Sequence, residues 1–159
     1  MAGYGDDTAF ATWLTANGYT VPASPDPAVL RQRGSVYVDG LYGARFPGYP
    51  TGGIEQDRLW PRTGAVDVYG NTISTTAIPS RIVEASYFAA YLEGNTPGIL
   101  SATFTPAQQK VLTEVKGIKW TVVGDASGDR AAFMVSTAID GMLYPLVGTS
   151  LLLPAIAIA

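Results

Sequence analysis

The 159-residue chain contains no cysteine and no histidine. Without cysteine it cannot form disulfides, thiol nucleophiles or cysteine-ligated zinc sites. Without histidine it cannot use imidazole for acid–base chemistry near neutral pH. A catalytic site would have to use carboxylates, lysine, tyrosine or an oxygen-ligated metal, and the carboxylates form no constellation suited to general acid–base work. We therefore expect a protein that is not an enzyme and has no cofactor.

Charge is also scarce. Charged residues make up 14% of the chain and apolar residues 47%, whereas soluble domains typically have about 25% charged residues. The length fits one domain. A free monomer with so few charges is poorly protected against association, which favours a subunit whose surface is covered by neighbours. The net charge of −3 contrasts with the basic excess of most nucleic-acid binders.

Six arginines nevertheless gather between residues 31 and 81. They could follow a phosphate backbone, or they could be surface and helix-end charges paired with nearby acids. The negative total favours the second interpretation. The arginines are Arg31, Arg33, Arg45, Arg58, Arg62 and Arg81, and the nearby acids are Asp39, Glu55, Asp57 and Glu84.

Apolar spacing and capping residues predict four helices. The first runs from residue 6 or 7 to the glycine at 18, and the second from the Asp-Pro pair at 26–27 to about residue 41. The third opens at the Ile-Pro pair at 78–79 and ends at the glycine at 94. The fourth covers residues 136–147. Two glycines, Gly34 and Gly40, are expected to weaken the second helix.

Residues 43–77 are rich in glycine and proline, and their aromatics argue against plain disorder. We expect a long structured loop there. Its most distinctive part is the segment LWPRTG at 59–64, in which an aromatic, a rigid proline and a guanidinium suit an interface anchor. The alternative is a loop pinned to the domain's own core by Trp60, with Arg62 capping carbonyls.

Residues 111–123 predict a short β-hairpin around a turn at Lys116 and Gly117. A short helix starting at Thr105 is an alternative for part of this region. Residues 148–159 form an apolar tail, which could add to a partner as a strand, pack back on its own domain, or fray. The predicted fold is mainly α (α+β): a small helical bundle with a long structured loop, a short β-hairpin and an extended C-terminal tail.

Three aspartates near the C-terminal half could ligate a hard cation. Their spacing is not that of an EF-hand loop, and a turn followed by a helix start explains them more simply. We expect no metal site at these residues, which are Asp125, Asp129 and Asp140.

Four features stand out along the chain: the stretch YVDGLYGARFPG at 37–48, Gln56, LWPRTG at 59–64 and the Ile-Pro pair at 78–79. Together they resemble the motifs of a family of small tailed-phage head–tail adaptor, or connector, proteins. Many members of that family are labelled DnaT-like single-stranded-DNA-binding proteins. The resemblance covers roughly residues 26–147 and is most specific around Trp-Pro-Arg.

The resemblance implies a structural protein of the virion neck, made in the host cytoplasm and without a membrane segment. About twelve copies would form a ring between the portal protein and a stopper or tail protein, and genomic double-stranded DNA would pass through without specific binding. Residues 1–147 would be the adaptor domain and residues 148–159 the portal-docking tail. The low charge suits such a channel, because a basic lumen would grip DNA.

The residues expected at subunit or partner contacts come from the loop and from the tail. They are Tyr42, Arg45, Phe46, Trp60, Pro61, Arg62, Leu151, Leu152, Leu153, Ile156 and Ile158.

Two other functions stay open. A single-stranded-DNA-binding accessory protein needs exposed aromatics flanked by basic residues, and only 60–62 and 116–120 have that composition. A small hydrolase with a carboxylate site is a third interpretation.

Overall fold

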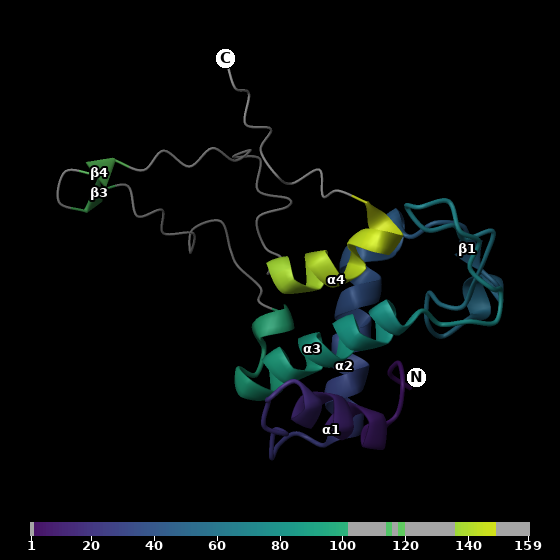
Figure 1. Ribbon diagram of the computed structural model, residues 1–159. Coiled ribbons are helices and arrows are strands. Elements are labelled where there is room, and N and C mark those ends of the chain that lie inside the picture. The colour runs from purple at the N-terminus through teal and green to yellow at the C-terminus, as the bar shows by residue number, and fades with distance from the viewer. Residues whose placement is uncertain (1, 102–113, 116–117, 120–135, 149–159) are drawn as a thin grey trace.

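The computed structural model describes residues 2–101, 114–115, 118–119 and 136–148. Figure 1 shows its helices, which are α1 (Asp7–Ala16), α2 (Pro27–Tyr42), α3 (Ser80–Asn95) and α4 (Thr137–Val147). All four predicted helices are confirmed. No helix among the described residues is long and apolar enough to span a membrane.

Side-chain caps explain three of the four helix starts. Asp6 accepts a 2.8 Å hydrogen bond from the backbone N–H of Ala9 at the start of α1. Asp26 caps α2 in the same way, with Pro27 in the first helical turn. Ser136 accepts from the first turn of α4. These residues satisfy backbone donors that have no partner inside the helix.

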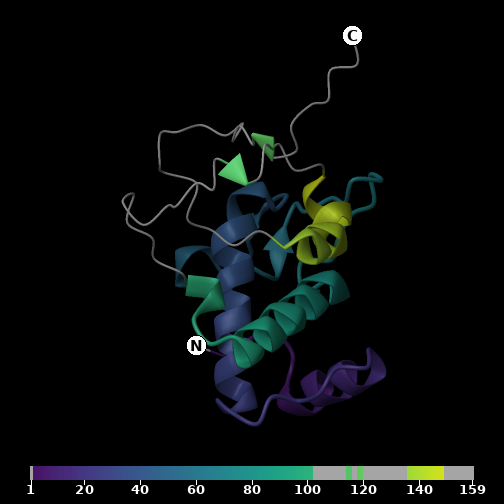
Figure 2. The same cartoon turned by 90° about the vertical axis from the view of Figure 1, so that its left-hand side faces the viewer.

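The long helices α2 and α3 pack against each other and form the centre of the bundle, as Figure 2 shows. Their close approach depends on Gly34, because a Cβ at this position would collide with the Ser86 carbonyl and with Ala90. α4 packs on α3, and α1 contacts both α2 and α3. The buried apolar residues form two clusters. One holds Tyr4, Tyr37, Val38, Tyr42, Phe46, Trp60, Ala65, Ile82, Ala85, Ala89, Ile139, Leu143 and Leu146, and the other holds Phe10, Leu14, Leu30, Tyr87 and Ala90.

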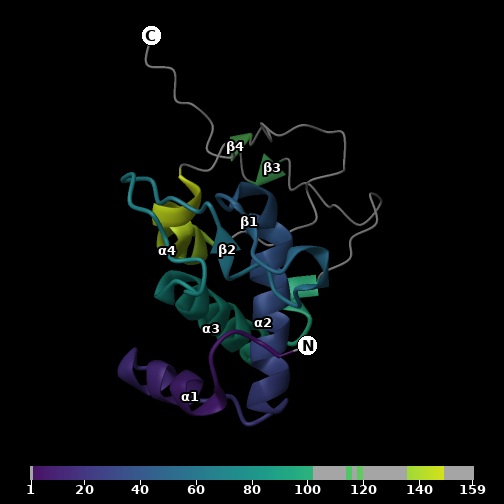
Figure 3. The same ribbon diagram turned by 90° about the vertical axis from the view of Figure 1, so that its right-hand side faces the viewer.

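The loop between α2 and α3 contains secondary structure that the sequence did not predict. Strand β1 (Tyr49–Pro50) pairs antiparallel with β2 (Arg62–Thr63). Two 3-10 turns, η1 (Gly43–Arg45) and η2 (Gly53–Glu55), precede and follow β1. Strands of two residues are too short to show the alternation from which strands are predicted. Figure 3 views this loop face-on.

The predicted hairpin is confirmed where the structure describes it. Strand β3 (Glu114–Val115) pairs antiparallel with β4 (Ile118–Lys119). A third 3-10 turn, η3 (Ile99–Ser101), follows α3. The mainly helical fold with a small β component is therefore confirmed, while the alternative helix at Thr105 and the tail at 149–159 lie outside the described residues.

Candidate functional site

The loop of residues 43–77, called the braced loop below, is fixed at its centre by Trp60. This side chain is 1% exposed and lies in the main core. Its ring meets that of Phe46 edge-on, with the centroids 5.8 Å apart. The backbone N–H of Trp60 donates to the hydroxyl of Tyr4 at 3.2 Å, and this hydroxyl donates to Asp39 at 2.6 Å. The middle of the loop is thus tied to α2 and to the N-terminal segment.

Arg62 fixes the same loop through its backbone carbonyls. Its Nε donates to the Pro47 oxygen at 2.7 Å, and its Nη2 donates to the oxygens of Gly48 at 2.5 Å and Phe46 at 3.4 Å. Its Nη1 donates to the Leu59 oxygen at 3.3 Å. The guanidinium is buried, and burial lowers the pKa of Arg62. The structure therefore shows the second interpretation of LWPRTG: Trp60 pins the loop to the core and Arg62 caps its carbonyls.

A buried ion pair joins the braced loop to α2. Nη1 of Arg58 lies 3.3 Å from a carboxylate oxygen of Asp39, and the two side chains are only 10% and 12% exposed. Burial raises the pKa of Asp39, and the hydrogen bond from Tyr4 and the charge of Arg58 oppose this rise. Gln56 adds a further brace, because its amide donates to the Arg58 and Pro61 oxygens at 2.7 and 3.0 Å.

The start of the braced loop is joined to the last helix. The hydroxyl of Tyr42 donates to Asp140 of α4 at 2.7 Å. Burial, with this hydrogen bond, raises the pKa of Tyr42 well above its usual range. Arg45 lies over the Tyr42 ring and donates to the carbonyl of Gly148 at 3.1 Å. Arg45 thus fixes the point from which residues 149–159 follow.

The predicted interface residues on the loop therefore face mainly inward. The structure buries the side chains of Tyr42, Phe46, Trp60 and Arg62 and leaves those of Arg45 and Pro61 half-buried. Direct contact of these residues with another subunit stays a prediction. The predicted tail residues lie outside the described residues; they are Leu151, Leu152, Leu153, Ile156 and Ile158.

The exposed apolar residues of the braced loop are ones that the sequence did not single out. Ile54 in η2 is 97% exposed, Tyr69 71% and Tyr49 62%. The η2 turn is closed by the Gln56 side chain, which accepts from the Gly52 N–H at 2.8 Å. A single isoleucine between a glycine and a glutamate carries no periodic signal, so only its position in the fold shows that it protrudes.

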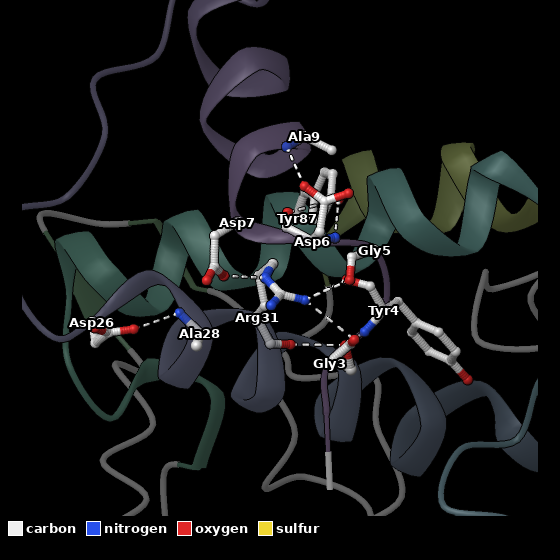
Figure 4. Close-up of polar contacts among 11 residues, drawn as sticks. Gly3, Tyr4, Gly5, Asp6, Asp7, Ala9, Asp26, Ala28, Arg31 and Tyr87 are labelled. Carbon is white, nitrogen blue, oxygen red and sulfur yellow. Dashed lines mark hydrogen bonds and ion pairs between the residues drawn. The ribbon is translucent and has the colours of Figure 1, made fainter.

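Most of the six arginines between residues 31 and 81 form ion pairs or hydrogen bonds within the chain. Figure 4 shows Arg31 between α1 and the N-terminal turn, with its Nε 2.7 Å from Asp7 and its Nη1 donating to the carbonyls of residues 3–5. Arg33 pairs with Glu93 at 3.0 Å. Ion pairs also hold Arg58, and carbonyls hold Arg45 and Arg62. Among the described residues, Arg81 is the exposed arginine of this group for which no such contact is found. Pairing with acids is thus confirmed for Arg31, Arg33 and Arg58, and of these three only Arg58 uses one of the predicted acidic partners, Asp39.

Within the described residues, no three acidic side chains gather in a group that could hold a metal ion. Asp140 accepts the hydroxyl of Tyr42. Asp125 and Asp129 lie outside the described residues.

Comparison with known proteins gives one finding. No curated protein and no solved structure matches the chain. A family model, however, matches residues 4–156, a range that includes all four helices and the braced loop. The chain therefore belongs to the family that this model defines, which is described as Putative DnaT-like ssDNA binding protein.

Proposed function

We propose that the protein is a structural adaptor of a tailed-phage neck, forming a ring between the portal and the stopper or tail. The observation that carries this proposal is the braced loop, in which buried Trp60 and Arg62 hold the backbone while Ile54 is 97% exposed. An apolar side chain on a fixed backbone loses little conformational freedom when a partner covers it. Exposed apolar surface on a rigid support is typical of protein–protein contact sites.

The shortage of free positive charge among the described residues supports a channel through which genomic DNA passes without being bound tightly. Most arginines of the first half are bonded within the chain, and the net charge is −3. In the part of the chain that the structure describes, few arginines are therefore free to release counterions from phosphates, which is the main source of affinity for nucleic acid.

The alternative is the single-stranded-DNA binding named in the family description. It requires exposed aromatics beside basic residues. Tyr69 is exposed, yet Asp67 lies two residues before it and accepts its backbone N–H at 2.9 Å. Tyr49 is exposed as well, and the acids Glu55 and Asp57 follow it in the sequence. These surroundings favour contact with protein over contact with phosphate.

The apolar tail completes the proposal as the segment that docks on the portal. Arg45 holds the Gly148 carbonyl at the beginning of the braced loop, so the tail follows a fixed point of the domain. Deleting 151–159 should leave a folded subunit that no longer joins the portal. Unfolding of the truncated chain would instead make the tail part of the core.

The test of the proposal is the native mass of the purified protein, alone and with the portal protein of the same phage. A ring of portal stoichiometry, or a monomer that assembles only on the portal, supports the adaptor. A parallel titration uses a single-stranded oligonucleotide at moderate salt. A monomer that ignores the portal but binds the oligonucleotide would overturn the adaptor and establish the alternative.

A further inference from the structure

A groove of about 540 Å³ lies between α2 and η3. One wall is a stripe of α2 that includes Val29, Arg33 and Val36, and the other includes Leu100 of η3. These α2 positions are spaced so that they share one helix face. In Figure 1 the green η3 turn lies to the left of α2 and the loop that carries β1 to its right, and Figure 2 shows η3 beside α2.

Val29, Val36 and Tyr37 of the α2 wall are apolar, whereas Gln32 and Arg33 are polar and basic. Val29 is 39% and Val36 51% exposed. The side chain of Arg33 is 49% exposed and keeps one nitrogen on the buried carboxylate of Glu93. Glu93 also accepts the backbone N–H groups of Gly98 at 3.0 Å and Leu100 at 3.2 Å. The Arg33 rim and the η3 wall are therefore held together by one carboxylate, which gives the groove a fixed shape before any partner arrives.

The η2 turn of the braced loop has the complementary character. Ile54 is almost fully exposed, and the acids Glu55 and Asp57 that follow it are exposed too. Gln56 closes the turn through the Gly52 N–H. This turn is thus a preformed apolar protrusion with negative charge beside it, and the groove combines apolar side chains with a guanidinium at its rim.

We propose that Ile54 of one copy inserts into the α2–η3 groove of the next copy, where Glu55 meets Arg33. This inference rests on the proposed ring and names its subunit contact. Ile54 is 97% exposed in the single chain, so it does not occupy the groove of its own molecule. Contacts between two different surfaces repeat head to tail and close into a ring when the rotation per subunit allows it.

The absence of cysteine from the sequence makes cross-linking a clean test. Chains carrying Ile54→Cys and Val36→Cys are mixed and oxidised, alone and with the portal. We expect a mixed disulfide dimer that forms at least about tenfold faster than either homodimer. A single chain carrying both substitutions should give a ladder of multimers that ends at the closed ring. As a control, Thr12→Cys on exposed α1 replaces Ile54→Cys and should give no mixed dimer.

Charge substitutions test the same contact without a covalent bond. Ile54→Glu and Val36→Glu alter exposed positions and add charges of the same sign, so each should fold normally and lower the amount of ring about tenfold or more. An equimolar mixture of the two should yield 1:1 dimers and nothing larger, because only one intact protrusion and one intact groove can meet.

The outcomes separate this contact from the adaptor proposal. A wild-type ring without the mixed disulfide would overturn the contact and leave the adaptor in place. Failure of both ring and disulfide would overturn both. A Val36→Cys thiol that no small thiol reagent reaches in the monomer would show that the chain fills its own groove, and this also overturns the contact.

Discussion

Tyr4 and Asp39 lie 35 residues apart in the sequence and are joined by a 2.6 Å hydrogen bond between hydroxyl and carboxylate. The same hydroxyl accepts the backbone N–H of Trp60, and Asp39 also pairs with Arg58. One buried phenol therefore connects the N-terminal segment, α2 and the braced loop. The rigidity of the loop depends on this connection.

Replacing Tyr4 by phenylalanine should destabilise the protein by about 1–3 kcal/mol, because two buried polar groups lose a hydrogen-bond partner. Hydrogen exchange should rise over residues 49–63, and denaturation in urea would measure the loss in free energy of unfolding. Tyr69→Phe, at an exposed position, is the matched control and should change neither quantity. Unaltered exchange in Tyr4→Phe would show that the phenol does not brace the loop.

Arg62→Lys should also lower the free energy of unfolding, by about 1–3 kcal/mol. A lysine ammonium is a single point charge and cannot match the planar guanidinium, which here donates to the carbonyls of Phe46, Pro47, Gly48 and Leu59. Arg81→Lys at an exposed position is the control and should be close to neutral. Equal stability of the two variants would contradict the carbonyl-capping role.

The raised pKa values of two buried tyrosines lead us to expect a loss of stability at alkaline pH. Burial, with the charge of Asp140 adding to it, raises the pKa of Tyr37 to about 12. Burial and the hydrogen bond to Asp140 raise the pKa of Tyr42 above its usual range. An unfolded tyrosine ionises near pH 10. The stabilising contribution is therefore complete below about pH 10 and is lost as the pH rises through the folded-state pKa.

The substitution Tyr42→Phe removes one of these groups. Between pH 10 and the pKa of about 12 that Tyr37 retains, the free energy of unfolding of the variant should fall less steeply with pH than that of the wild type. The slope measures the protons released on unfolding, and the variant should release up to one fewer per molecule. Urea unfolding in steps from about pH 8 upward measures this slope. A variant with the wild-type slope would show that Tyr42 does not hold its proton in the folded state.

The helices could be predicted from the sequence because their signals are local. Asp6, Asp26 and Ser136 are side-chain caps that can be recognised without knowledge of the fold. The clustering of Trp60 and Arg62 also identified the segment that organises the loop. Its two interpretations could not be separated, because an aromatic and an arginine suit an interface and a core equally well. Long-range partners such as Tyr4 and Asp39, which the local pattern does not specify, place both side chains inside.

The exposed part of the candidate site could not be predicted for the opposite reason. Ile54 is a single apolar residue in a glycine-rich turn. Without apolar neighbours at regular spacing, the sequence does not predict whether such a residue is buried or exposed. Its exposure follows from the Gln56 side chain closing the turn and from the short β1–β2 ladder. The groove beside α2 depends on η3 and on the interaction of Glu93 with two backbone N–H groups, which no sequence period encodes.

From the sequence, both glycines of α2 are expected to weaken the helix. The structure shows that they differ in how closely other residues approach them. Gly34 lies at the crossing with α3, where a Cβ would collide with the Ser86 carbonyl and with Ala90. At Gly40 a Cβ would have open space, with no atom of another part of the chain within 4 Å. Gly34→Ala should force the two helices apart and destabilise the protein by about 1–3 kcal/mol.

Gly40→Ala should instead stabilise the protein by about 0.5–1 kcal/mol, because alanine restricts the unfolded chain and favours the helix. Thermal and urea unfolding of the two variants would measure these opposite signs. Since both substitutions add the same methyl group to the same helix, helix propensity affects them equally, and the difference reports the closeness of α2 and α3. Stabilisation of both variants would contradict the tight crossing on which the bundle depends.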